Sequence, residues 1–168
     1  MEQIMHAKDQ FAQLKLMIFD VDGVFTDGSI LLMENGDQLR TFNIKDGYMV
    51  QQATKKGLHL AVITGCRSEA VKKRLEYLGI KDIYLGIQEK LDAYNELLSI
   101  HNLNHSEVLY MGDDMPDYDI MKRVGIPVCP NDAVPAIREL SRYISPFKGG
   151  KGCVRDIVEQ VLRAKNLL

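Results

Sequence analysis

Short apolar runs alternate with amphipathic helical patterns along most of this chain. The runs show little polar alternation and span residues 14–19, 58–63, 83–85, 108–111 and 126–128. Such runs are typical of strands that are buried on both faces, as in a parallel sheet. Helical spacing fills the intervals, over residues 70–78, 91–100, 134–140 and 154–162. Strands that alternate with helices predict a Rossmann-like α/β fold, with right-handed crossovers and helices on both faces of the sheet.

Residues 29–42 interrupt this alternation. Two apolar segments flank the turn at residues 34–37, and its Asn35-Gly36 pair is a strong short-range signal for a β-hairpin. We therefore predict a hairpin insertion at about residues 28–43, directly after the first strand. A two-stranded ribbon with apolar side chains on both faces is marginal alone in water, so we expect another subunit to cover it. Its apolar residues are Ile30, Leu31, Leu32, Met33, Leu39 and Phe42.

The composition is that of an ordinary soluble protein. A length of 168 residues predicts one domain over residues 1–168, with a tail helix at about 153–165. Twenty-one basic against 23 acidic residues give a net charge of −2, which argues against a nucleic-acid partner. No run approaches a membrane span, and residues 1–15 lack the apolar stretch of a signal peptide, so we expect a cytoplasmic protein without a membrane partner. Cys66, Cys129 and Cys153 are far apart, which predicts reduced thiols rather than a disulfide framework.

Polar groups follow three of the predicted strands. They are Asp20-x-Asp22, Thr64–Gly65 and Gly112-Asp-Asp-x-x-Asp117, and Lys90 adds a cation at the start of a helix. In parallel α/β sheets, ligands bind outside the carboxyl ends of the strands, so these groups should meet at one edge. Carboxylates suit a hard cation, and we expect Asp20 and Asp113 to bind Mg²⁺ together with substrate phosphate.

These segments resemble the four motifs of the haloacid dehalogenase superfamily. The motifs are Ile18-Phe-Asp-Val-Asp-Gly-Val24, Val62-Ile-Thr-Gly65, Lys90 and Met111-Gly-Asp-Asp-x-x-Asp117, in that order over nearly the whole chain. The resemblance implies that Asp20 is a nucleophile that forms an aspartyl-phosphate. It also implies that Asp22 is the general acid and base; an Asp at this position distinguishes the phosphatases of the superfamily from its dehalogenases.

The same resemblance assigns the other groups of the site. Thr64 would hydrogen-bond the phosphoryl oxygens, and Lys90 would pair with the phosphate and with Asp20. Asp20, the backbone carbonyl of Asp22, and Asp113 would hold Mg²⁺. Asp117 would orient the metal site rather than bind the metal.

The chain has no room for a cap domain in either connection around the second motif. A finer resemblance, to the 3-deoxy-D-manno-octulosonate 8-phosphate (KDO 8-phosphate) phosphatases, offers a reason. It covers essentially the full length and rests on Asp22-Gly-Val-Phe-Thr-Asp-Gly28, Phe42-Asn-Ile-Lys-Asp-Gly47, Thr64-Gly-Cys-Arg-Ser68 and Gly149-Gly-Lys-Gly-Cys-Val-Arg155. Those enzymes are capless homotetramers in which a neighbour's hairpin helps to cover each site. Cys66 stands where relatives often carry Arg or Glu.

The implied substrate is a small sugar-acid phosphate, which carries a carboxylate in addition to its phosphate. We expect Arg67 to bind that carboxylate, with Arg74 and Lys45 behind it, and Asn43 and Asp46 to hold sugar hydroxyls. The full set expected to bind substrate is Asp22, Asn43, Asp46, Thr64, Gly65, Arg67 and Lys90. Residues 148–152 form either a mobile flap over an active site or a plain turn. Two alternatives stay open: a nine-carbon keto-deoxy sugar acid 9-phosphate as substrate, and a non-catalytic tetramerisation module.

Overall fold

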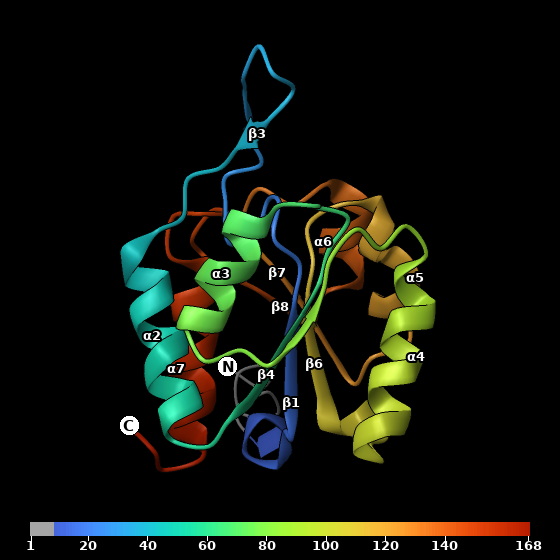
Figure 1. Ribbon diagram of the computed structural model, residues 1–168. Helices are drawn as coiled ribbons and strands as arrows, with labels where there is room; N and C mark the ends of the chain where they lie inside the picture. Colours follow the sequence, from blue (N-terminus) through green and yellow to red (C-terminus); the bar gives the residue numbers. More distant parts are fainter. Residues whose placement is uncertain (1–8) are drawn as a thin grey trace.

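A computed structural model describes residues 9–168 and contains one large parallel sheet (Figure 1). Every neighbouring pair of its six strands is parallel. The order across the sheet is β5 (Asp82–Tyr84), β4 (His59–Ile63), β1 (Leu16–Phe19), β6 (Val108–Met111), β7 (Ile126–Cys129) and β8 (Tyr143–Ile144). The predicted fold class is confirmed, and each predicted strand is present to within two residues.

Helices cover both faces of this sheet, as the alternating pattern predicts (Figure 1). One apolar core includes residues from α2 (Ile44–Lys55), α3 (Glu69–Tyr77) and α7 (Cys153–Ala164). The other includes residues from α4 (Lys90–His101), α5 (Tyr118–Met121) and α6 (Pro135–Leu140). Along β1, Met17 and Phe19 contribute to the first core, and Leu16 and Ile18 to the second. This period of two explains why β1 is apolar at every position, since both of its faces are buried.

The central position of β1 locates the ligand site. The chain leaves β1 to build β4 and β5 on one side, and then returns to build β6, β7 and β8 on the other. Such a reversal opens a crevice at the carboxyl ends of the strands, where open α/β sheets bind their ligands. The connections that follow β1, β4 and β6 therefore meet at this edge.

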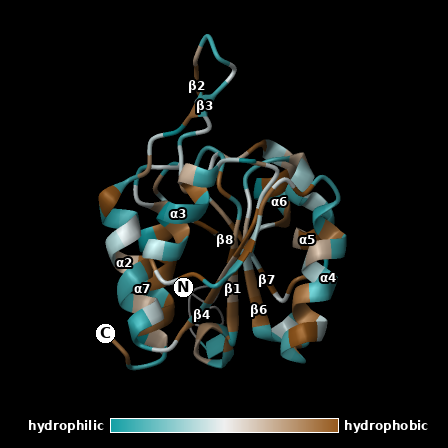
Figure 2. Ribbon diagram, in the orientation of Figure 1, coloured by the Kyte–Doolittle hydropathy of each residue, from teal (hydrophilic) through white to brown (hydrophobic). Residues whose placement is uncertain are grey.

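The predicted hairpin is present and extends away from the body of the molecule (Figure 2). Its strands, β2 (Leu31–Leu32) and β3 (Gln38–Leu39), are antiparallel, and Gly36 turns the chain with a φ of +90°. Five of its predicted apolar residues are at least 42% exposed: Ile30, Leu31, Leu32, Met33 and Leu39. Phe42 differs, because its ring stacks on Phe25 and packs against the core.

Several elements lie outside the sequence pattern. The helix α2 was not predicted, because its buried side includes Asp46 and Gly47, which are poor helix formers, beside Met49, Val50 and Ala53. The helix α5 and the strand β8 are too short for a periodic signal. Two 3₁₀ turns, η1 (His105–Glu107) and η2 (Met115–Asp117), complete the described elements. Within residues 9–168, the connection from β1 to β4 consists of the hairpin and α2, and the connection from β4 to α4 consists of α3 and β5. Neither connection therefore contains a cap domain.

Candidate active site

The four predicted motifs meet at the carboxyl edge of the sheet. Asp20 follows β1, Thr64 follows β4, Asp113 follows β6, and Lys90 is the first residue of α4. They line one pocket of about 520 Å³, together with Asp22, Gly28, Gly65, Cys66, Ile87, Gln88, Asp114 and Pro116. Asp20 and Asp113, which are separated by 93 positions in the sequence, therefore belong to a single polar site.

Lys90 joins two carboxylates, that of Asp20 in this pocket and that of the buried Asp117. Its Nζ lies 2.9 Å from Oδ2 of Asp20 and 2.8 Å from Oδ1 of Asp117, and only 4% of its side chain is exposed. Burial lowers the pKa of Lys90, but Asp117 and Asp20 outweigh it and leave the pKa raised. The ammonium is therefore held in its charged form beside Asp20, as pairing with a phosphate requires.

Asp117 positions its neighbours rather than facing the pocket. It is fully buried, and its Oδ1 accepts hydrogen bonds from Lys90 and, at 2.6 Å, from the Tyr110 hydroxyl. Its Oδ2 accepts the backbone N–H of Asp113 at 3.0 Å. Three donors thus use the Asp117 carboxylate and fix the Asp113 loop to Lys90. Tyr110 was not singled out from the sequence, because it is hidden inside an apolar strand.

The acidic groups suit a divalent cation. One carboxylate oxygen from each of Asp20, Asp113 and Asp117 lies within 4.8 Å of the others. Burial, with repulsion from Asp117, raises the pKa of Asp20 to about 7, although Lys90 opposes the shift. Burial, with the charges of Asp20 and Asp117, raises the pKa of Asp113 to about 8. This excess of negative charge is what a hard cation would neutralise, so the donor set fits Mg²⁺.

Gly23 makes the close approach of these loops possible. A Cβ at this position would lie 1.8 Å from Oδ2 of Asp113, and the φ of Gly23 is +84°. Both the conformation and the space therefore require glycine directly after Asp22.

Asp22 is held by a residue that the sequence did not indicate. The Arg40 guanidinium binds it through both carboxylate oxygens, at 2.6 Å from Nε to Oδ1 and 3.0 Å from Nη2 to Oδ2. Only 7% of the Arg40 side chain is exposed. Arg40 lies just after β3, so the hairpin brings a cation to the predicted general acid. Asp22 and Arg40 are 18 positions apart, so no local sequence pattern links them. The position of Arg40 directly after the second hairpin strand was the one feature of the sequence that could have suggested the contact.

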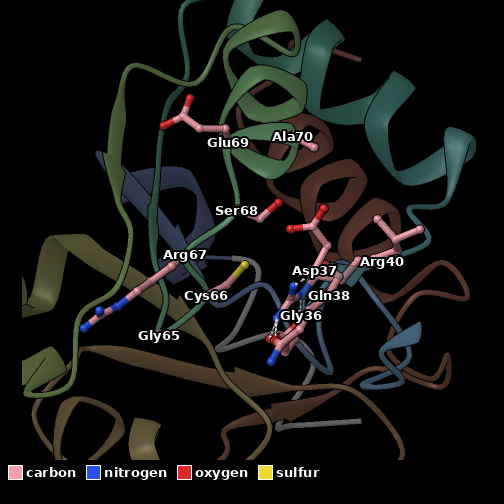
Figure 3. Close-up of a pocket in the computed structure, with 12 residues that line it drawn as sticks. Gly36, Asp37, Gln38, Arg40, Gly65, Cys66, Arg67, Ser68, Glu69 and Ala70 are labelled. Atoms are coloured by element: carbon pink, nitrogen blue, oxygen red, sulfur yellow. Dashed lines mark hydrogen bonds and ion pairs between the residues drawn. The ribbon is translucent and has the colours of Figure 1, made fainter. Parts of the chain in front are cut away.

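A second pocket of about 640 Å³ continues from the first between the hairpin and the start of α3 (Figure 3). The two pockets share Asp22, Gly65 and Cys66. Arg40 and the predicted carboxylate ligand Arg67 both line it, and Figure 3 shows the Arg67 side chain extending away from Arg40. Arg74 lies further away, over the Tyr77 ring at 5.7 Å.

Two residues predicted to bind sugar hydroxyls, Asn43 and Asp46, lie outside the two pockets described above. Asp46 is fully buried, and its oxygens accept the backbone N–H groups of Gly152 at 3.3 Å and Arg155 at 2.8 Å. In this structure Asp46 therefore anchors the start of α7, and its contact with sugar hydroxyls stays a prediction. Asn43 caps α2 through the N–H of Lys45 and donates to the carbonyl of Gly150, outside both pockets described above.

Residues 148–152 pack against residues 23–26, in the loop that follows β1. Gly150 donates its N–H to the carbonyl of Val24 at 2.9 Å, and Gly149 donates to Asp132 at 2.9 Å. A Cβ on Gly149 would lie 2.0 Å from the carbonyl oxygen of Gly23. The segment is a turn, closed by a hydrogen bond from the N–H of Lys151 to the carbonyl of Lys148 at 3.0 Å, and it packs against the loop that carries Asp22 and Gly23.

Comparison with known proteins identifies the class. The family profile described as haloacid dehalogenase-like hydrolase matches residues 42–130. The chain belongs to this family, and its curated relatives are phosphatases. It is 38% identical over 157 residues to the 3-deoxy-D-manno-octulosonate 8-phosphate phosphatase KdsC of Yersinia pestis, covering 94% of this chain and 84% of that protein.

Solved structures agree with this similarity. The crystal structure of the Yersinia pestis phosphatase matches with a TM-score of 0.92 and 37% identity, over 96% of this chain and 87% of the other. A Moraxella catarrhalis phosphatase of the same name matches with a TM-score of 0.92 and 33% identity, over 96% and 92% of the two chains. That structure is a complex with a magnesium ion, a phosphate ion and a KDO molecule.

Proposed function

We propose that this protein is a Mg²⁺-dependent phosphatase that releases phosphate from KDO 8-phosphate. The observation that carries the proposal is the arrangement of Asp20, Lys90 and Asp113 at the strand ends, in a chain that matches KdsC phosphatases over nearly its full length. The non-catalytic alternative is weaker, because a module that served only assembly would not need this set of paired and buried charges.

In the proposed reaction, the carboxylate of Asp20 attacks the phosphorus atom of the substrate and the sugar alkoxide leaves. Lys90, at 2.9 Å from Asp20, offsets the repulsion between this carboxylate and the incoming phosphate. Thr64 and the adjoining Gly65 line the pocket, and there they would donate hydrogen bonds to the phosphoryl oxygens. Water then attacks the aspartyl-phosphate at phosphorus, which releases phosphate and regenerates Asp20.

Asp22 is the proposed proton donor to the leaving alkoxide, and then the base that takes a proton from the attacking water. Both of its oxygens accept hydrogen bonds from Arg40 here, so the carboxyl group is directed to the guanidinium rather than to a leaving group. We therefore infer that Arg40 changes partner when substrate binds. The carboxylate of a sugar acid in the second pocket would take the place of Asp22, which would free Asp22 for catalysis.

A bound Mg²⁺ would neutralise charge on the transferring phosphoryl group and help to orient it. Asp20, Asp113 and the backbone carbonyl of Asp22 are the proposed ligands, with Asp117 holding the Asp113 loop in place. All are oxygen ligands, which is the set that Mg²⁺ prefers.

We also propose that the protein is a homotetramer in which hairpins of neighbouring subunits cover the active sites. Leu31 and Leu32 are 64% and 67% exposed on a ribbon that extends beyond the carboxyl edge of the sheet (Figure 1). No helix within residues 9–168 is long and apolar enough to cross a membrane. The three cysteines are buried and unpaired, which is compatible with the cytoplasmic location that we propose.

The nine-carbon alternative is tested by parallel kinetics. We expect kcat/KM for KDO 8-phosphate to exceed that for a nine-carbon keto-deoxy sugar acid 9-phosphate by at least tenfold, and both activities to disappear when EDTA replaces Mg²⁺. A reversed preference would assign the nine-carbon substrate. Hydrolysis of neither compound, with an aryl phosphate also left intact, would contradict the phosphatase proposal itself.

A further inference from the structure

Three ligand-type side chains converge on one point away from the active site. Nε2 of His59 lies 2.5 Å from Oδ2 of Asp82, and Nε2 of His101 lies 3.0 Å from the same oxygen. Their ligand atoms all lie within 4.8 Å of one another. The two imidazole rings meet edge to face, with centroids 4.3 Å apart. Two nitrogens and one oxygen therefore point into a shared space.

Three different elements hold this cluster in place. His59 is the first residue of β4, Asp82 is the first residue of β5, and His101 is the last residue of α4. All three are half-buried, with 26–30% of each side chain exposed. The cluster is thus anchored by the fold and is still open to solvent on one side.

The same elements carry catalytic groups at their other ends. His59 precedes Thr64 by five residues of strand, which is about 16 Å at ~3.3 Å per residue. His101 follows Lys90 by eleven residues of helix, which is also about 16 Å at ~1.5 Å per residue. The cluster is therefore at the opposite edge of the sheet and shares no residue with the catalytic pocket.

We propose that His59, Asp82 and His101 form a second metal site, which binds a divalent transition metal such as Zn²⁺. Zinc bonds of about 2.0–2.2 Å in a tetrahedral arrangement place neighbouring ligand atoms roughly 3.3 Å apart. The observed separations of 2.5 and 3.0 Å need to open by less than an ångström to admit the ion. Water would occupy the fourth position on the exposed side.

The chemistry of the two sites differs. Imidazole nitrogens favour zinc, nickel and copper, whereas carboxylate and carbonyl oxygens favour magnesium. The His59 cluster should therefore take a transition metal while Mg²⁺ occupies the oxygen ligands near Asp20. Both histidines must bind as neutral imidazoles, so binding should weaken at acidic pH.

A metal here would fasten an exposed edge of the fold. The edge strand β5 has three residues, and within residues 9–168 it pairs with β4 alone. A metal that joins β5, β4 and α4 would resist opening of this edge. The inference does not depend on the substrate proposed above, since neither its ligands nor its test involve the sugar phosphate.

The test is competitive Zn²⁺ binding against a fluorescent chelator in saturating Mg²⁺, with wild type, His59→Gln, His101→Gln and the control His105→Gln. His105 is an exposed histidine whose ring nitrogen Nδ1 is hydrogen-bonded to the Tyr94 hydroxyl at 2.8 Å. Removing a residue that only hydrogen-bonds to a metal ligand lowers metal affinity by about 10–100-fold. Removing a ligand itself should therefore lower the Zn²⁺ affinity of this site at least tenfold. We expect wild type and His105→Gln to bind one Zn²⁺ that both ligand variants lose.

The unfolding temperature provides a second readout. One equivalent of Zn²⁺ should raise it in wild type and in His105→Gln, and leave it unchanged in His101→Gln. The ligand variants should keep wild-type hydrolysis of an aryl phosphate, which shows that they are folded. Equal Zn²⁺ affinity in all four proteins, or wild-type binding only at millimolar Zn²⁺, would overturn the proposal and leave a hydrogen-bonded His–Asp–His cluster.

Discussion

At the scale of single residues, charge balance governs the active site. Asp20, Asp113 and Asp117 bring three carboxylates within 4.8 Å of one another, and Lys90 supplies one positive charge among them. With all groups ionised, the set carries two negative charges, which one divalent cation would neutralise. Burial, together with repulsion among the carboxylates, raises the pKa of Asp20 to about 7 and that of Asp113 to about 8, so protons offset part of this charge when no cation is bound.

Replacing Asp22 by Asn tests its role as proton donor. A sugar alkoxide is a poor leaving group that needs a proton, and general acid catalysis contributes about 10²–10⁴-fold. We expect Asp22→Asn to lose activity in that range on the sugar phosphate and less on an aryl phosphate with a good leaving group. Equal losses on the two substrates in steady-state kinetics would show that Asp22 is not the acid.

Arg40 is tested against Arg67, since both line the pocket proposed for the sugar acid. If Arg40 exchanges Asp22 for the substrate carboxylate, Arg40→Gln should raise KM for KDO 8-phosphate at least tenfold. KM for an aryl phosphate without a carboxylate should change little. The matched variant Arg67→Gln, whose side chain points away from Arg40, should have the smaller effect (Figure 3). A larger increase in KM for Arg67→Gln than for Arg40→Gln would instead show that Arg67 binds the substrate carboxylate, as predicted from the sequence.

At the scale of elements, the strands that lead into the active site could be predicted, because each is a continuous apolar run followed directly by polar residues. The residues 108–111 were predicted as a strand and form β6 with those bounds. Contacts between distant elements were not predictable: Arg40 reaches Asp22 because the returning strand β3 of the hairpin ends beside the site, and Asp46 is buried because α2 packs against α7. The motifs thus predicted which side chains meet at the strand ends, but not which way a side chain points where packing between helices decides its direction.

The hairpin should be the element that assembles the protein. We expect light scattering at micromolar concentration to show a tetramer for wild type and a smaller species for the double variant Leu31→Asp, Leu32→Asp. Charge on this ribbon would oppose burial against a second copy. A matched control is Ile100→Asp on α4, since Ile100 is 63% exposed and Leu31 is 64% exposed. A monodisperse wild-type monomer would contradict the proposed assembly.

At the scale of the whole molecule, the raised pKa values of Asp20 and Asp113 link folding to pH and metal. Between pH 4 and about 8, the folded metal-free protein binds protons at these groups that the unfolded chain has released. Its free energy of unfolding should therefore fall as pH rises, by at most about 1.4 kcal/mol per pH unit for each such carboxyl.

Thermal unfolding with and without Mg²⁺ measures this linkage. We expect the metal-free protein to melt at a lower temperature at pH 8 than at pH 5.5, and Mg²⁺ to raise the midpoint more at pH 8. Asp113→Asn removes one of the two groups and should reduce both trends. A metal-free midpoint that rises between these pH values, equally in wild type and variant, would contradict the assignment of buried acidic charge at this site.

The most direct measurement of the central claim is phosphate release from KDO 8-phosphate in Mg²⁺ by wild type and by Asp20→Asn. An amide has nearly the shape of the carboxylate but is a far weaker nucleophile. We expect wild type to reach a kcat/KM within the usual enzymatic range of about 10⁴–10⁸ M⁻¹s⁻¹. Asp20→Asn should lose more than about 10³-fold while keeping the wild-type circular dichroism spectrum. Comparable turnover by Asp20→Asn, in protein free of wild-type enzyme, would contradict a covalent mechanism at Asp20, and a wild type inactive on this substrate would contradict the proposed function.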